Sequence, residues 1–494
     1  MRRVIHPVFG LTIALTFASA SAQTQTVQSI ASATNAADTK SIEYSGSGHW
    51  FQFGQAPAPS LPWPQFNVSR FTADINYDTS SARVQIIRSQ TVEPGRLRPA
   101  PVEQRVDQYV AGAYAWNIAP PANAPQGTAP ATTPQPAAVE ERTAEILATP
   151  QGFIKAALAN NAIVKSVKGG TEVSFTVDGK HRYVGTVNNR NQVERVRTWI
   201  ATPVLGDTLV ETKYSDYKDF DGIQFPSHIV RTQGGYPVLD IAVSGVKVNP
   251  VVDIVAPQEI ANAKAPAVVV TTNKLAEGVY YLTGGTHHSV AIEQRDHVVV
   301  IEAPQNEERS LAVIAKVKET IPNKAIKYLV NTHAHFDHSG GLRTFVDEGA
   351  TIVTEQANQP FYQKAWAAPR TIDSDRLAKS KKIAKFETFK TKHVLSDGKR
   401  SIEIYPIIGS GHNDAFALVY LPAEKILIEA DAYTPLAANA PLPTAPNPYT
   451  VNLYENIQKL KLDVEQIAAL HGPRVVTIAD LRSVIGRENV ANAK

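Results

Sequence analysis

The chain has 494 residues, of which 43% are hydrophobic and 19% charged, and it contains no cysteine. This length predicts two or three domains with a large apolar core and excludes intrinsic disorder as the overall class. Without cysteine, disulfide scaffolds, thiolate metal sites and cysteine nucleophiles are excluded, so any metal has to be held by His and carboxylates. The formal charge of +3 falls to near neutrality without residues 1–22, and a near-neutral chain lacks the basic surface that nucleic acid requires.

The first 22 residues have the features of a secretory signal peptide. Arg2 and Arg3 precede an apolar run from about Val8 to Ala20, which is followed by an A-x-A cleavage site that ends at Ala22. The run is shorter than the roughly 20 residues that a membrane-spanning helix needs, and no later stretch reaches that length without charges. We therefore expect export to the periplasm or the extracellular space, with no membrane span.

Residues 43–255 are expected to form a β-rich accessory domain behind a flexible, Ser/Thr/Ala-rich lead-in at 23–42. Alternating apolar residues predict strands at 82–88, 172–177, 183–187, 193–200, 208–217 and 240–248, and Asp-Gly pairs at 178 and 221 predict hairpin turns. Helices are expected at about 140–147 and 152–160. The Pro/Ala-rich segment 118–138 reads as an exposed loop.

The segment Tyr214–Ile229 within this antiparallel meander resembles the curved sheets of the LolA/LolB lipoprotein-carrier type. The resemblance rests on the strand pattern and implies either a groove for an apolar ligand or a lid over the second domain. The alternative is a purely structural accessory domain.

Residues 265–494 have a different sequence pattern, in which short apolar runs alternate with segments that have helical spacing of apolar residues. Apolar runs at 298–301, 326–330, 402–408, 416–421 and 426–428 predict strands, and the spacing of apolar residues over 307–321 predicts a helix with one buried face. These features indicate an α/β domain.

Three His and one Asp lie within six residues directly after the apolar run 326–330, in the segment Asn331-Thr-His333-Ala-His335-Phe-Asp337-His338. The carboxyl ends of buried strands are where α/β folds build their sites. Alternate residues of an extended segment face one side, so His333 and His335 would face one point and Asp337 and His338 a second. This predicts two metal ions about 3.5–4 Å apart, bound by imidazole and carboxylate as zinc is in hydrolases.

Such a short motif cannot fill two coordination spheres, and further candidates follow at the ends of later elements. His412 follows the apolar run 402–408, Asp431 follows the run 426–430, and His471 follows the stretch 468–470, which reads as helical.

Together, HAHFDH, the later GSGH, the strand-terminal Asp and the final LHG are similar to the metallo-β-lactamase fold superfamily over about residues 270–494. The resemblance implies a four-layer αββα sandwich, here preceded by a mainly antiparallel β domain, with a dinuclear zinc site. It implies that His333, His335 and His412 hold one zinc, that Asp337, His338 and His471 hold the other, and that Asp431 bridges both. Iron and manganese versions of this site are the alternatives to zinc.

The function expected from this site is hydrolysis of a small ester, lactone or amide, of the β-lactam or lactone type, by a hydroxide that the metals hold. Asp337 would orient the attacking group and move its proton. A thioesterase or phosphodiesterase of the same fold is the nearest alternative. The rival from another class is a carrier protein that binds an apolar ligand in the N-terminal sheet and has an ancillary metal domain. Sequence does not decide the oligomeric state.

Three residues are candidate substrate contacts. Tyr433 follows Asp431 closely, as a carbonyl-binding tyrosine does in related lactonases, although here it is offset by one residue; the alternative is a tyrosine packed in a loop. His287 and His288 lie in a hairpin loop that overhangs the site in this fold. The segment 435–449 holds five prolines and no charged residue, so we expect it to form a stiff wall of an apolar pocket.

Overall fold

The structure is a computed structural model, and it describes residues 26–120, 128–264 and 267–487. Three β-sheets organise it: a sheet of thirteen strands (sheet A) and two smaller sheets of seven (sheet B) and six strands (sheet D). Sheet A lies within Ser41–Val248, and sheets B and D lie within Thr271–Thr477. We call residues 26–264 the N-terminal part and residues 267–487 the C-terminal part.

Sheet A has the strand order β6-β5-β4-β3-β2-β1-β13-β12-β11-β10-β9-β8-β7, and all its pairs are antiparallel. Its strands are β1 (Ser41–Phe51), β2 (Gln65–Asn76), β3 (Ser81–Gln90), β4 (Gln104–Ala111), β5 (Tyr114–Ala119), β6 (Ala131–Pro134), β7 (Ile163–Val167), β8 (Gly170–Val177), β9 (His181–Asn188), β10 (Val193–Thr202), β11 (Gly206–Phe220), β12 (Ile223–Gln233) and β13 (Tyr236–Val248). Asp221 and Gly222 lie between the paired residues Phe220 and Ile223 and both have positive φ, at 50° and 91°, as a two-residue type I′ hairpin requires.

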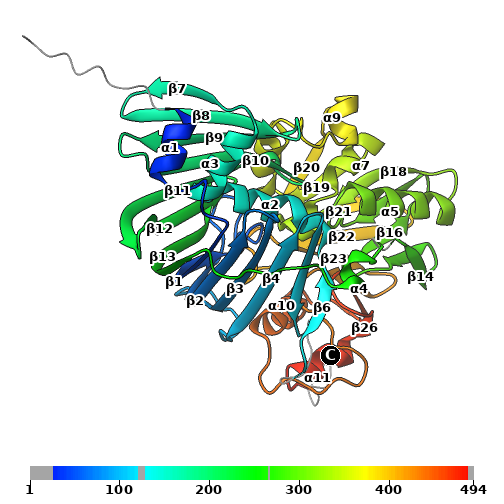
Figure 1. Ribbon diagram of the computed structural model, residues 1–494. Coiled ribbons are helices and arrows are strands. Elements are labelled where there is room, and N and C mark those ends of the chain that lie inside the picture. Colours follow the sequence, from blue (N-terminus) through cyan, green and yellow to red (C-terminus); the bar gives the residue numbers. More distant parts are fainter. Residues whose placement is uncertain (1–25, 121–127, 265–266, 488–494) are drawn as a thin grey trace, which may run out of the picture.

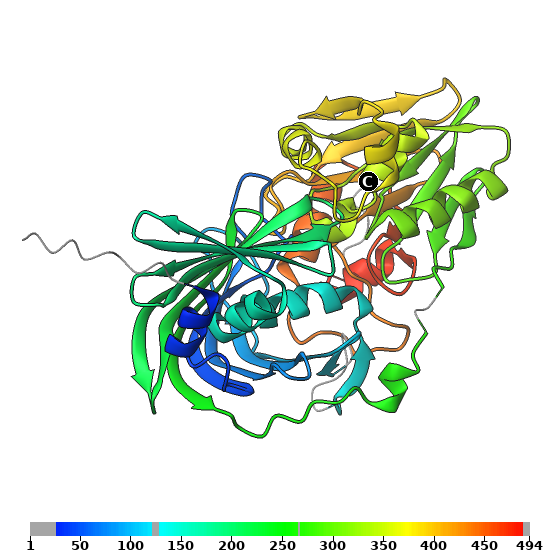
Figure 2. The same ribbon diagram turned by 45° about the horizontal axis from the view of Figure 1, so that its top comes forward.

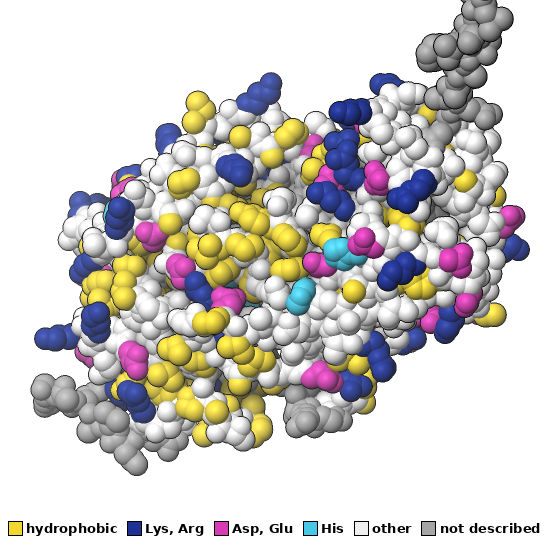
Figure 3. Space-filling view, turned by 90° about the vertical axis from the view of Figure 1, so that its left-hand side faces the viewer, with side chains coloured by type: hydrophobic (Ala, Val, Ile, Leu, Met, Phe, Trp, Pro, Cys, Tyr) yellow, Lys and Arg dark blue, Asp and Glu magenta, His cyan; other side chains and the backbone are white. Residues whose placement is uncertain are grey.

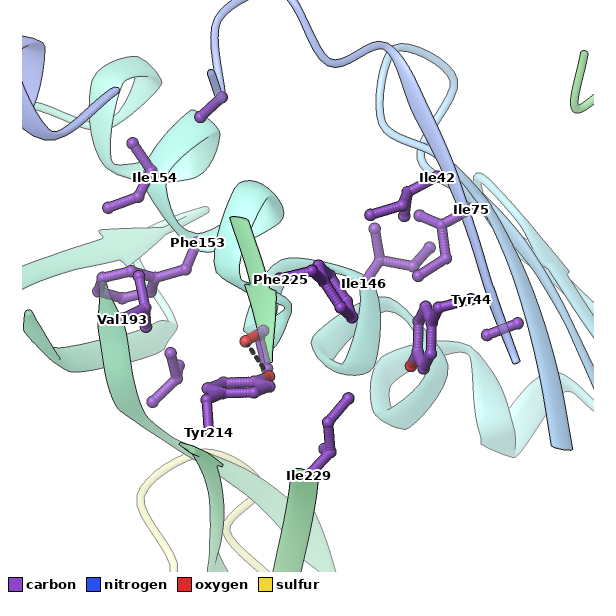
Figure 4. Packing of buried hydrophobic residues seen from close by; sticks show 14 of the residues in the cluster. Ile42, Tyr44, Ile75, Ile146, Phe153, Ile154, Val193, Tyr214, Phe225 and Ile229 are labelled. Atoms are coloured by element: carbon purple, nitrogen blue, oxygen red, sulfur yellow. Dashed lines mark hydrogen bonds between the residues drawn. The ribbon is translucent and has the colours of Figure 1, made fainter. Parts of the chain in front are cut away.

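Sheet A curves around a small group of helices, as Figures 1 and 2 show. These are α1 (Val27–Ala33), α2 (Val139–Ala148) and α3 (Pro150–Ala159), preceded by the 3₁₀ turn η1 (Pro136–Ala138). Alternate strand residues point into the curve, where Ile42, Tyr44 and Phe225 pack with Ile146 and Phe153 of the helices (Figure 4). The helices therefore fill the concave side of the sheet and provide its core.

The C-terminal part is a sandwich of four layers. Sheet B has the order β14-β15-β16-β17-β18-β19-β20 and sheet D the order β21-β22-β23-β24-β25-β26, and side chains from both sheets form one buried core between them. Helices α5, α7 and α8 pack on the outer face of sheet B, and α10 and α11 on that of sheet D. The expected αββα architecture, preceded by a mainly antiparallel β region, is confirmed.

The strands of the sandwich are β14 (Thr271–Ala276), β15 (Val279–Thr283), β16 (Ser289–Glu293), β17 (His297–Ile301), β18 (Ala325–Val330), β19 (Thr351–Glu355), β20 (Phe386–Phe389), β21 (His393–Ser396), β22 (Ser401–Pro406), β23 (Ala417–Leu421), β24 (Ile426–Glu429), β25 (Gln466–Ala469) and β26 (Val476–Thr477). The remaining helices are α4 (Gln258–Ala261), α5 (Glu307–Thr320), α6 (Phe336–Ser339), α7 (Leu342–Glu348), α8 (Asn358–Trp366), α9 (Arg376–Ser380), α10 (Pro448–Lys459) and α11 (Ile478–Val484).

Three local expectations differ from the structure. Within the supposed flexible lead-in, Thr26 and Ser29 form a capping box, and α1 buries Ile30 completely. The Pro/Ala-rich segment contributes an edge strand, β6, where missing backbone donors are tolerated. The run before His471 is strand β25 rather than a helix, because it pairs in parallel with β24 inside sheet D.

The two parts of the chain meet at several specific contacts. Asp207 accepts hydrogen bonds from the backbone N–H groups of Thr371 and Ile372 at 2.8 and 3.1 Å, and Arg96 forms a two-pronged ion pair with Asp414. Phe53 packs edge-on against Phe336 with ring centres 5.2 Å apart. Residues 1–25, which include the signal peptide predicted at 1–22, lie outside the described residues. None of the described helices is long and apolar enough to cross a membrane.

Candidate metal centre

The His-rich segment begins where β18 leaves the buried core. His333 and His335 lie in the loop after this strand, and Asp337 and His338 lie on the single turn of α6. Gly340 and Gly341 follow, where an added Cβ would approach Gln305 O and Ser310 Oγ to 1.8 Å. Only glycine therefore lets this turn pack closely against the neighbouring loop.

The three downstream residues come from sheet D. His412 follows β22, Asp431 follows β24 and His471 follows β25, and all of them lie at the edge of the sandwich where the His-rich segment lies. Asp431 has a positive φ of 62°, a conformation that costs free energy for a non-glycine residue and that clusters at functional sites. The structure thus brings all seven predicted metal ligands together.

The first group consists of His333, His335, His412 and Asp431, whose candidate ligand atoms all lie within 4.8 Å of one another. The Nε2 atoms of His333 and His412 are 3.3 Å apart, and Asp431 Oδ2 lies 3.3 Å from His412 Nε2. Three imidazoles and one carboxylate around a common point match the donor set of a zinc site.

The second group contains His338, Asp337, Asp431 and His471. Asp431 Oδ2 lies 3.0 Å from His338 Nε2, its Oδ1 lies 2.8 Å from His471 Nδ1, and Asp337 Oδ2 lies 3.8 Å from His338 Nε2. Because the Asp431 carboxylate contacts both groups, it occupies the position that a bridging ligand needs.

Burial and the neighbouring histidines keep His333 and His335 of the first group unprotonated. Burial lowers the pKa of His335 to about 3, with a further contribution from His412, and burial likewise lowers the pKa of His333 well below its ordinary value. His335 Nδ1 is buried and has no hydrogen-bond partner among the described residues. A buried, neutral imidazole nitrogen without a hydrogen-bond partner is the donor that a metal ion requires, so these residues fit a metal.

The carboxylates of the second group are ionised. Burial alone would raise the pKa of Asp431, but His338 outweighs it and holds this pKa well below its ordinary value. Burial alone would lower the pKa of His338, but the nearby carboxylates of Asp431 and Asp337 have the larger effect and raise this pKa well above its ordinary value. The centre therefore presents two ionised carboxylates next to the neutral imidazoles of His333 and His335, a donor set that a divalent cation can use.

A buried polar network that the sequence did not reveal supports the His-rich segment. Glu302 is fully buried, has a positive φ of 70°, and accepts hydrogen bonds from Asn331 Nδ2 at 2.8 Å and from Thr332 Oγ1 at 2.5 Å. Tyr362 donates to Asn331 Oδ1 at 2.6 Å. One sequence feature could have identified Glu302: it is an acidic residue directly after the apolar run 298–301, which is fully buried.

The N-terminal part also reaches the centre, through the segment Gln52–Pro59. Gln55 Nε2 donates to Asp337 Oδ1 at 2.8 Å, and Ala56 O lies 3.0 Å from His335 Nε2 and accepts from Asn413 Nδ2 at 3.0 Å. Ala56 O therefore fixes Nε2 of His335 as the protonated nitrogen and leaves Nδ1 free for a metal. No sequence signal marked these residues.

The three candidate substrate residues lie in different environments. His287 stacks on His471 with ring centres 4.1 Å apart, and its Nε2 lies 3.3 Å from Asp337 Oδ2, so it belongs to the centre. His288 is buried against Tyr281, and its Nε2 lies 2.6 Å from Gly472 O. Tyr433 is only 3% exposed and packs in the core outside sheet D.

A cavity of about 910 Å³ lies beside His471. Gly285 and Thr286 line one side, and Pro435, Leu436 and Pro443 line the other, so the proline-rich segment forms a wall as expected. His471 and Asp337 are also the most exposed metal-ligand candidates, with side chains 35% and 31% accessible. The centre is thus open on the sides of His471 and Asp337, and the N-terminal part covers His335.

Residues 282–450 match the model of the metallo-beta-lactamase superfamily. Among solved structures, a metallo-beta-lactamase from Pontibacter korlensis is 20% identical, covers 45% of this chain and all of its own, and has a TM-score of 0.34. One from Hirschia baltica is 18% identical (44% and 96% covered, TM-score 0.33), and the flavodiiron protein from Giardia intestinalis is 17% identical (44% and 59% covered, TM-score 0.35). No curated protein sequence matches the chain. The LolA-like character of the N-terminal part is not confirmed.

Proposed function

We propose that the chain is an exported dizinc enzyme that hydrolyses a small ester, lactone or amide; the match of residues 282–450 to the metallo-beta-lactamase superfamily model supports a metal-dependent hydrolase. The observation that carries the proposal is the convergence of seven His and Asp side chains from four separate segments, with Asp431 in contact with both groups. His333, His335 and His412 would hold one ion, His338, His471 and Asp337 the other.

Two bound zinc ions would supply Lewis acidity and lower the pKa of bound water toward neutrality. The protein's own residues would do the rest. Asp337 is held in place by Gln55 through Oδ1 and by His287 at Oδ2, and its carboxylate would accept a proton from the attacking water and pass it to the leaving group. Water adds to the carbonyl carbon, the bond to the leaving oxygen or nitrogen breaks, and the proton ends on that atom.

The surroundings of the centre support a small organic substrate. The cavity beside His471 has mainly apolar walls and a size typical of small-molecule sites. Lys and Arg are interspersed with Asp and Glu on the face that Figure 3 shows, which does not match the continuous basic stripe of a nucleic-acid-binding surface. Export rests on the signal-like residues 1–22, and the mature protein would act in the periplasm or outside the cell.

The proposal is tested by metal analysis and a hydrolysis screen on the full chain. We expect about two zinc ions per chain by mass spectrometry, together with turnover of at least one β-lactam, lactone, ester or thioester that EDTA abolishes and zinc restores. His335→Ala and His412→Ala should lose metal and turnover and stay folded, whereas His228→Ala, in the N-terminal sheet, should keep both. Full turnover in His335→Ala would reject these residues as metal ligands. If the native protein contained iron or manganese, the proposed identity of the metal would be wrong, but the proposed ligands and the hydrolase function would stand.

A further inference from the structure

The curved sheet of the N-terminal part encloses a hollow of about 260 Å³ between its concave face and helix α2. Tyr44, Ile75 and Ile146, which point into the space between strand and helix in Figure 4, line it together with Phe71 and Leu239. Protein interiors rarely contain voids larger than a water molecule. A hollow of this size inside an otherwise well-packed core is therefore a candidate binding site.

Small side chains keep the hollow open, and polar side chains lie at one end of it. Ala73, Ala82 and Ala138 are part of its wall. At the polar end, Arg231 pairs with Glu145, and Glu141 and Gln233 also line the hollow.

A second cavity, of about 380 Å³, lies next to the hollow and borders Asp337 of the metal centre. Phe53, Glu141 and Gln233 line both cavities, and Phe336 lines the second one. Asp337 is one of the two most exposed ligand candidates, with a side chain that is 31% accessible. A route from Asp337 to the hollow would pass Phe336 and then Phe53, Gln233 and Glu141, and we call this route the path.

We propose that the substrate carries an unbranched apolar chain, and that this chain lies along the path with its end in the hollow while the carbonyl group lies at the metal centre. This inference rests on the proposed hydrolase function and adds the class of substrate: an acyl ester, acyl lactone or acyl thioester of medium chain length. Hydrolysis would add water across the acyl bond and release an amphipathic carboxylic acid and an alcohol or thiol; from a lactone, ring opening would give a single hydroxy acid.

The side chains that line the hollow favour an unbranched apolar chain as its ligand. The inner lining is aromatic and aliphatic, which favours hydrocarbon, and the two glutamates of the polar end are balanced by Arg231 and Arg142. A balanced set of charges gives no attraction for a second anionic group inside the hollow. Phe53 and Phe336, in edge-on contact with ring centres 5.2 Å apart, add an aromatic surface to the second cavity, which also favours a hydrocarbon chain.

The test uses the full-length zinc-loaded protein and p-nitrophenyl esters from acetate to decanoate. We expect kcat/KM to rise about two- to fourfold for each added methylene until the hollow is filled, because each methylene leaves water on binding. In Ala73→Phe and Ala138→Trp, which both fill the hollow, this rise should disappear. Thr72→Phe, on the opposite face of the same strand as Ala73, is the matched control and should keep it.

Binding of dansyl-undecanoate to the EDTA-treated protein separates this inference from the proposed function, because it needs neither metal nor turnover. Saturable fluorescence enhancement that Ala138→Trp removes and Thr72→Phe keeps supports the hollow, and it does so even if no ester is hydrolysed, in which case the protein is a carrier. Turnover without chain-length dependence, or probe binding that Ala138→Trp leaves intact, overturns it. Circular dichroism identifies any variant that fails to fold, and Ala138, which is only half buried, tolerates the larger side chain more easily than Ala73.

Discussion

The side-chain amide of Gln55 donates to Asp337 Oδ1, so that Oδ2 faces His338, while the carbonyl of Ala56 lies 3.0 Å from His335 Nε2. Outer partners of this kind orient metal ligands, and their loss commonly lowers metal affinity by about 10–100-fold. We therefore expect Gln55→Leu to weaken zinc binding by about this factor, with the largest effect on the ion that Asp337 would hold.

The measurement is competition for zinc between the protein and a chromogenic chelator, supported by the visible spectrum of the cobalt-substituted protein. Gln55→Glu places a carboxylate opposite Asp337 and should disturb the spectrum differently from Gln55→Leu. Gln258→Leu, on the exposed helix α4, is the control. Unchanged affinity in Gln55→Leu would show that Asp337 is held in place without the N-terminal part.

The neutral histidines of the centre make the metal-free protein sensitive to acid. An unfolded histidine has a pKa of about 6.5, whereas the pKa of His335 in the folded protein is about 3, that of His288 is about 4, and that of His333 is also depressed. The unfolded chain therefore binds more protons than the folded one between pH 6.5 and 4. The free energy of unfolding should fall as the pH falls through this window.

Urea unfolding of the EDTA-treated protein at pH 7 and pH 4.5 measures the effect. His338 has a raised pKa and stays protonated in the folded state, whereas unfolded histidine takes up its proton near a pKa of about 6.5, so His338 opposes the fall in stability above about pH 6 and adds little slope below it. His335→Leu removes one of the contributing groups and should make the pH dependence shallower. A stability that stays level from pH 7 to pH 4.5 would contradict the neutral state of these side chains.

On the scale of elements, helix α1 is an ordered part of the core rather than a flexible leader. Its Ile30 is fully buried with Val27 and Ala31, and its N-terminus is capped by Thr26 and Ser29. Replacing a buried isoleucine with alanine typically costs about 2–5 kcal/mol of stability. We expect Ile30→Ala to lower the free energy of unfolding by this amount in urea titrations, whereas Gln28→Ala on the exposed side should change it by about 0.5 kcal/mol or less.

The sequence predicted those elements whose local pattern and final environment agree. Val298–Ile301 is a fully apolar run and Ile326–Val330 is interrupted only by Lys327, and both form central strands of sheet B. The stretch before His471 is rich in alanine and lacks β-branched residues except Ile467, so only its pairing with β24 makes it a strand. The composition of α1 suggested a linker, because its burial depends on contacts with a helix that is distant in sequence.

Some residues of the metal centre could be predicted from the sequence and others could not. His333, His335, Asp337 and His338 are close in sequence and carry a recognisable spacing, and His412, Asp431 and His471 each follow a strand. Gln55 and Ala56 lie about 280 positions away from their partners, and a glutamine and an alanine in a loop have no composition signal. Contacts between distant segments of the chain therefore decided what sequence reasoning missed.

At the scale of the whole molecule, the N-terminal part forms one wall of the centre that the C-terminal part carries. Asp207 joins the two parts away from the metal: its carboxylate accepts from the N–H and hydroxyl groups of Thr371, at 2.8 and 2.6 Å, and from the N–H of Ile372. These hydrogen bonds hold the pKa of Asp207 below its ordinary value, although burial opposes them.

Asp207→Ala should therefore loosen the two parts without touching a metal ligand. Loss of a charged acceptor that serves several donors should cost about 1–3 kcal/mol, and we expect a lower Tm in calorimetry or the appearance of two transitions in place of one. Zinc affinity should change less than twofold, in contrast to Gln55→Leu, because the Gln55 and Ala56 contacts remain. Asp207→Asn keeps one carbonyl acceptor and should lie between the variant and the native protein. If Asp207→Ala and Gln55→Leu lost zinc affinity equally, the whole interface between the two parts of the chain would hold the metal ligands in place. The segment Gln52–Pro59 would then have no special role.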